Sequence, residues 1–170
     1  MKLRQNDPPR QSPRGAEVPV HFPMDDERHS RTLKFRLQME EDGTPRVVTG
    51  YFTVGMYADG TPGEVHIDSN KEGDGIRGLA RSWSIAISML LQYGVPPQVI
   101  YDKFKWRAFQ PDGISGVEGV PLVKSIVDLV VRWMELKLPP TAGDATEKDQ
   151  GWLGMVEEVS LNLSPAEDGD

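Results

Sequence analysis

Apolar and polar residues begin to alternate at residue 31, which is the pattern of a strand with one buried face. Every second position there is apolar, in the order Leu33, Phe35, Leu37 and Met39. Turn-forming sequences at 41–45 and 58–63 separate this strand from two further candidate strands at 46–57 and 64–68. The pattern predicts a three-stranded antiparallel meander with one face open to solvent or to a ligand.

The apolar spacing changes to a helical period at 76–93, 98–106 and 121–136. The first helix is predicted to bury one broad apolar face, formed by Ile76, Leu79, Ala80, Trp83, Ile87 and Leu90. Its far flank carries a second group of apolar residues, Ile85 and Met89. Such second faces are typical of subunit interfaces, so we expect a homodimer.

The third predicted helix carries three groups of residues. Its core face is formed by Leu122, Ile126, Leu129, Val130 and Trp133. A second apolar face, which we assign to the same kind of interface, is formed by Val123, Val127 and Met134. The polar residues Lys124, Asp128 and Arg132 are spaced four apart, and we interpret them as a solvated ladder of ion pairs.

These elements predict one α+β domain at residues 28–137, in which a three-stranded antiparallel meander packs against about three helices. Residues 1–27 carry five prolines and no apolar period, so we expect a flexible, disordered N-terminal arm. Residues 138–170 are expected to form a disordered acidic tail. This tail contains a short apolar segment at 152–156.

Composition narrows the classes of function. The chain has 170 residues and no cysteine, which excludes disulfides, thiolate metal sites and thiol catalysis by this chain. Its net charge of −7 comes entirely from residues 138–170, so residues 1–137 are neutral and duplex nucleic acid is not an expected partner. Without an apolar run long enough for a membrane or a signal segment, we expect a soluble cytoplasmic protein with no membrane partner.

The start of the first predicted helix is a candidate site for an anionic ligand. Lys71, Gly73, Arg77 and Arg81 combine cations with free backbone amides at a helix N-terminus, which suits a nucleotide phosphate. An ordinary tight turn with solvated arginines explains the same residues. Further along the helix, Ser84 and Ser88 are small enough to let either a nucleotide or the sheet approach, and packing against the sheet is the interpretation we favour.

Two other groups of side chains could carry chemistry. Tyr51 and Tyr57 could stack on a nucleotide base, although paired aromatic residues on a sheet commonly pack across strands. Glu64, His66 and Asp68 alternate along one strand, so they share a face and form a weak candidate for a divalent-metal or acid–base site. Such a row more commonly forms a solvated strand face. We therefore predict no catalytic residue, no bound metal and no cofactor.

Several stretches resemble the domain that follows the catalytic barrel in adenosylcobalamin-dependent, class II ribonucleotide reductases, a domain related to the TSCPD family. The resemblance covers residues 22–137, with order and spacing kept. It is carried by residues 51–65 (YFTVGMYADGTPGEV), 71–73 (KEG), 86–96 (AISMLLQYGVP), 102–104 (DKF), 109–113 (FQPDG), 124–128 (KSIVD) and 132–133 (RW).

The resemblance implies an accessory or regulatory domain that is not an enzyme by itself, because reduction of ribonucleotides by this family requires cysteines. It implies a partner, the catalytic chain of a class II reductase, and adenosylcobalamin only through that partner. The alternative that we keep is a nucleotide-binding or nucleotide-sequestering protein, encoded by a phage. An enzyme acting through Glu64, His66 and Asp68 ranks last.

Overall fold

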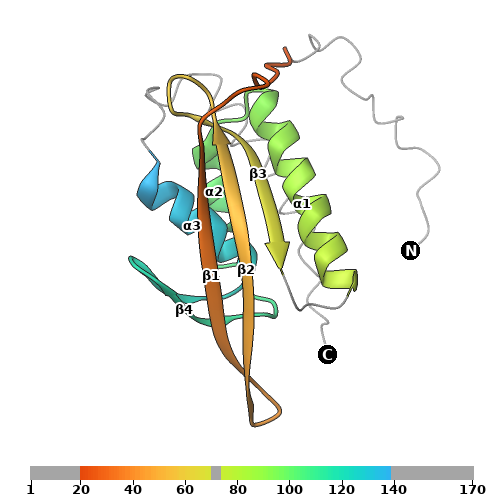
Figure 1. The fold of residues 1–170 in the computed structure, drawn as a ribbon, viewed down its shortest axis with the longest axis vertical. Helices are drawn as coiled ribbons and strands as arrows, with labels where there is room; N and C mark the ends of the chain where they lie inside the picture. Colours follow the sequence, from red (N-terminus) through yellow and green to blue (C-terminus); the bar gives the residue numbers. More distant parts are fainter. Residues whose placement is uncertain (1–19, 70–73, 139–170) are drawn as a thin grey trace, which may run out of the picture.

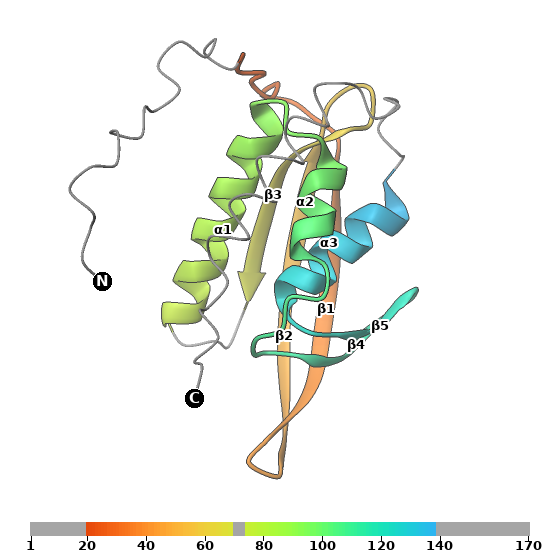
Figure 2. The same ribbon diagram turned by 180° about the vertical axis from the view of Figure 1, so that it is seen from behind.

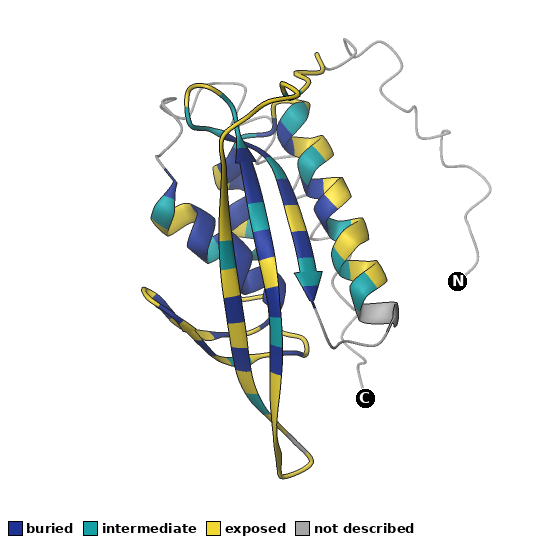
Figure 3. Cartoon of the chain, in the orientation of Figure 1, coloured by how far each residue is buried: buried dark blue, intermediate teal, exposed yellow. Residues whose placement is uncertain are grey.

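The three predicted strands are present in the computed structural model, which describes residues 20–69 and 74–138 (Figure 1). They are β1 (Ser30–Glu41), β2 (Thr44–Met56) and β3 (Pro62–Ser69), paired antiparallel in chain order. Alternation along β2 places Val48, Phe52 and Val54 in the core. The expected α+β meander is therefore confirmed, and Figure 3 shows this alternation along the strands.

The sheet has two strands more than the sequence predicted. β4 (Gly113–Val117) and β5 (Val120–Val123) form a short hairpin beside β1, which gives the order β3-β2-β1-β4-β5. Consequently the third helix does not begin at residue 121. It is α3 (Ile126–Lys137), whose N-cap Ser125 accepts a hydrogen bond from the Asp128 amide at 3.1 Å.

The helices divide between one face and one edge of the sheet. α2 (Pro97–Phe104) and α3 cover one face, and the opposite face of β1 and β2 is open (Figures 1 and 2). α1 (Asp74–Gln92) runs alongside the outer edge of β3. The core lies between α3 and the sheet, where Trp133 packs edge-on against Phe52 with ring centroids 5.1 Å apart.

The position of α1 at an edge corrects its predicted core face. Leu79 is 73% exposed and Leu90 is 39% exposed, whereas the fully buried residues of the described part of α1 are Ser84, Ile87 and Leu91. A helix that packs beside a strand buries a narrow stripe, so the broad apolar face that the sequence suggested is only partly used. Ile85, which the sequence places on the far flank of the helix, is 62% exposed, as predicted.

The predicted second face of the third helix is wrong. Val123 lies on β5 rather than on the helix, and it is buried, as are Val127 and Met134 on α3, which packs against both β5 and α2. Leu122 was assigned to the core, but it lies on β5 and is 59% exposed.

Asp128 does not belong to a solvated ladder of ion pairs. It is fully buried and accepts hydrogen bonds from the backbone amides of Trp106 at 2.6 Å and Lys124 at 2.9 Å. Arg132 donates to the same carboxylate at 3.3 Å, and its guanidinium lies 4.1 Å from the centre of the Trp106 ring. This carboxylate therefore ties the segment after α2 to the start of α3.

Residues 20–27, which we assigned to the flexible arm, contact the domain. The Phe22 amide donates to the Gln92 carbonyl at 2.8 Å, and the Tyr57 hydroxyl donates to the Phe22 carbonyl at 2.6 Å. The rest of the predicted arm and the acidic tail beyond residue 138 lie outside the described residues.

Candidate functional site

A groove of about 740 Å³ lies between β3 and α1 and contains most of the described candidate residues. From α1 it is lined by a polar stripe, Arg81, Ser84, Ser88 and Gln92, and by the apolar side chains of Ile85 and Met89. From β3 it is lined by Glu64, Val65 and His66, and Arg28 also lines it. The structure thus brings together two groups that the sequence suggested separately, the helix stripe and the row on the third strand.

Ser88 and Gln92 join α1 to the free edge of β3, whereas the buried Ser84 hydroxyl donates to the Ala80 carbonyl of its own helix at 2.8 Å. Ser88 Oγ accepts from the Val65 amide at 3.0 Å, and it lies 2.7 Å from the Ser84 carbonyl, to which it donates. Gln92 Nε2 donates to the Gly63 carbonyl at 3.1 Å. An uncovered edge strand exposes unpaired backbone groups, so this contact protects β3. These bonds support packing against the sheet as the role of Ser88, and Ser84 is buried at 2% exposure.

Replacing Ser88 by alanine is expected to destabilise this edge by about 1–2 kcal/mol, because the half-buried Val65 amide loses its acceptor. The effect is local, so amide hydrogen exchange of Val65 should accelerate more than that of Val54 on β2. Ser82→Ala, at an exposed position of the same helix, is the matched control and should leave both rates unchanged. Equal exchange at Val65 in the two variants would contradict the bridging role.

The charged residues of the groove are already paired. Arg28 makes two hydrogen bonds to Glu64, Nε to Oε1 at 2.8 Å and Nη2 to Oε2 at 2.9 Å, and these bonds raise the pKa of Arg28. Arg81 lies 3.8 Å from Asp68, with both side chains about half exposed. Across residues 20–69 and 74–138, no three histidine or acidic side chains gather closely enough to hold a metal ion. The row Glu64, His66 and Asp68 therefore forms part of a charge-balanced surface.

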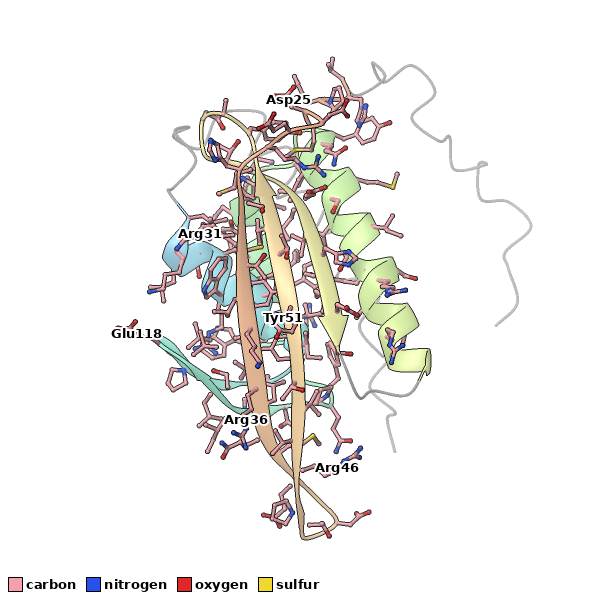
Figure 4. All side chains as sticks on the ribbon, in the orientation of Figure 1. Asp25, Arg31, Arg36, Arg46, Tyr51 and Glu118 are labelled. Carbon is pink, nitrogen blue, oxygen red and sulfur yellow. The ribbon has the colours of Figure 1, made fainter. Side chains whose placement is uncertain are left out.

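The predicted nucleotide residues do not all lie together. Arg77 is in the first turns of α1 and its Nε is buried with no hydrogen-bond partner, whereas Lys71 and Gly73 lie outside the described residues. Tyr57 is near Gln92 at the other end of α1, about 22 Å from Arg77 along the helix axis. Tyr51 lies midway along β2 on the open face of the sheet, 40% exposed, with Lys34 Nζ 5.7 Å from its ring centre (Figure 4).

Two further features were not found from the sequence. A cavity of about 560 Å³, lined mainly by apolar side chains, lies between α1, residues 104–111 and the start of α3. α1 and the residue that directly follows it expose a group of apolar side chains, which we call the α1 apolar face: Leu79, Ile85, Met89, Leu90 and Tyr93. Only Ile85 and Met89 had been recognised as exposed, because helical spacing alone does not reveal which side of a helix is covered.

No helix among the described residues is long and apolar enough to cross a membrane.

The amino-acid sequence is similar to a known domain family and to several known proteins. The family model described as the TSCPD domain matches residues 24–138. A vitamin B12-dependent ribonucleotide reductase of Rhodopirellula baltica is 40% identical over 109 residues, which are 64% of this chain and 10% of that protein. Proteins of the same description from Streptantibioticus cattleyicolor and Bradyrhizobium diazoefficiens are 37% and 38% identical, over 54% and 52% of this chain and 15% and 8% of their own lengths.

The chain therefore spans about a tenth of the length of the curated relatives that it matches. No solved structure matches it.

Proposed function

This chain belongs to the TSCPD domain family, and on that premise we propose that it is a non-enzymatic accessory or regulatory domain of a vitamin B12-dependent ribonucleotide reductase, acting in deoxynucleotide supply. The observation that carries the proposal is the 40% identity over 109 residues to a vitamin B12-dependent ribonucleotide reductase. These residues make up only 10% of that reductase, which suits an accessory domain rather than a complete enzyme. The chain contains no cysteine and would contribute no thiol to the reaction. Any adenosylcobalamin would then be held by the partner reductase.

The α1 apolar face supports docking onto a partner. Its members are between 38% and 73% exposed; four of them lie on α1, and Tyr93 directly follows its last residue. Contiguous apolar patches of this kind are typical of protein–protein interaction sites. The open face of the sheet is more polar, because Lys34, Arg36 and Thr53 alternate with the buried residues of β1 and β2, so α1 is the surface better suited to bury apolar area.

The test is binding of the purified chain to the vitamin B12-dependent reductase encoded in the same genome, measured by analytical ultracentrifugation. We expect a complex, and we expect the double variant Ile85→Asp, Met89→Asp to weaken it at least about tenfold, because two charges must be buried in the interface. Both residues are exposed, at 62% and 54%, so circular dichroism should show an unchanged fold.

The matched control is Leu136→Asp, which changes a 51% exposed leucine on α3 and should leave binding intact. Absence of a complex at high micromolar concentrations would contradict the accessory function. A homodimer that the double variant dissociates would assign the α1 apolar face to a second copy of the chain, as the sequence first suggested.

The alternative function, a phage-encoded nucleotide-binding protein, has less support from the described residues. Arg28 and Arg81 each face a carboxylate, so the groove offers little net positive charge to a phosphate. Nucleotide binding stays a prediction.

A further inference from the structure

The cavity between α1, residues 104–111 and α3 has features of a binding site for an apolar peptide segment. Its walls include Ala80, Trp83, Phe104 and Val127. Leu79 and Phe109 also line it, although they are 73% and 51% exposed. An apolar occupant would remove this surface from water, which is favourable in proportion to the area covered.

Trp83 forms part of the cavity wall contributed by α1. Its indole Nε1 is buried and has no hydrogen-bond partner among the described residues. Its ring is fixed by an edge-on contact with Phe104, with centroids 5.5 Å apart. The aromatic ring therefore offers ordered apolar surface to an occupant of the cavity.

We propose that residues 152–156 of this same chain, Trp-Leu-Gly-Met-Val, bind in this cavity. They are the first apolar stretch after residue 138, ahead of the separate apolar residues Val159, Leu161 and Leu163. Trp152, Leu153 and Met155 supply side chains that fit an apolar cavity of about 560 Å³.

The length of the connecting sequence allows this contact. The first turn of α3 contributes Ile126 and Val127 to the cavity, and the helix ends at Lys137, about 18 Å away along its axis. Residues 139–151 can reach up to about 43 Å when extended. The segment can therefore return to the cavity, and its covalent connection gives it an advantage in local concentration over any separate partner.

The charges next to residues 152–156 and at the cavity also favour this contact. Asp149, Glu157 and Glu158 flank the apolar segment, and Arg107 lines the cavity. Opposite charges at the rim of an apolar contact orient the two surfaces.

Because the chain lacks cysteine, pairs of introduced cysteines can test the contact in the full-length protein. The test pair is Leu79→Cys with Met155→Cys, and the matched control is Ile85→Cys with Met155→Cys. Leu79 and Ile85 are exposed to similar extents on the same helix, but only Leu79 lines the cavity. Disulfide formation in dilute solution with a mild oxidant is followed by intact mass and by non-reducing gel mobility.

We expect the test pair to close within one chain at least about tenfold faster than the control pair. A second test pair, Phe109→Cys with Met155→Cys, should show the same advantage, and adding Trp152→Ser should remove it. Equal rates for test and control pairs would overturn the proposal. Disulfide-linked dimers as the main product would also overturn it, because the segment would then occupy the cavity of a second copy.

Discussion

Asp128→Ala is expected to lower the free energy of unfolding by about 3–5 kcal/mol, the largest effect that we expect from a single change in this domain. The carboxylate is fully buried and accepts from two backbone amides, those of Trp106 and Lys124, as well as from Arg132. Its removal leaves two backbone amides without their acceptor, and each unsatisfied buried donor costs about 1–3 kcal/mol, whereas Arg132 keeps its bond to the Leu122 carbonyl at 2.7 Å. Urea denaturation measures the change.

Two other variants separate the contributions. Asp128→Asn keeps an acceptor oxygen but loses the charge opposite Arg132, so its effect should fall between those of wild type and alanine. Asp102→Ala removes a surface carboxylate that lies 3.3 Å from Lys105 and is expected to cost less than about 1 kcal/mol. If Asp128→Ala were no more destabilising than Asp102→Ala, the anchoring role of Asp128 would be wrong.

Gly113→Ala is expected to destabilise the domain by about 3 kcal/mol or more, because two penalties add. The φ angle of Gly113 is +125°, which side chains rarely tolerate. A Cβ there would also collide with the backbone carbonyl of Gln38, where β1 pairs with β4. Backbone cannot move aside as a side chain can, so we expect the β4–β5 hairpin to detach from β1.

Gly116→Ala in the same hairpin provides the control for backbone strain alone. Gly116 has φ +64°, but an added Cβ would meet nothing within 4 Å, so the expected cost is about 1–2 kcal/mol. Hydrogen exchange at the β1–β4 pairing, next to Ile114, should rise strongly in the Gly113 variant only. Similar losses of stability in both variants would show that the contact with Gln38 has no energetic role.

Part of the network around Asp128 was present in the sequence as a recognisable signal. Ser125 and Asp128 have the spacing of a helix N-cap followed by an acidic residue three positions later, which predicts a helix beginning near residue 126. The apolar run before Ser125 concealed this signal, because Val120 and Val123 continue a pattern that also fits a helix. Residues 120–123 form a strand rather than a helical turn, because β5 pairs with β4 and β4 lies beside β1, a distant part of the chain.

The groove between β3 and α1 was predicted from the sequence only in part, for a different reason. The helical period placed Ser84 and Ser88 on one stripe, and alternation placed Glu64 and His66 on one strand face, both of which the structure retains. Neither the helical nor the strand period indicates which other element packs against these side chains. The partners Val65 and Gly63 are more than twenty residues distant, so their hydrogen bonds follow only from how the elements pack.

The sequence by itself determined the meander of three strands, the presence of three helices, the neutral charge of residues 1–137 and the resemblance to the family, because periodicity, charge and motif spacing are properties of the chain alone. The tertiary structure decided that α1 covers the edge of β3, that Asp128 is buried and that the α1 apolar face is open. The physical reason is that burial depends on the element that packs opposite. An identical pattern of side chains can face water, a strand edge or a partner.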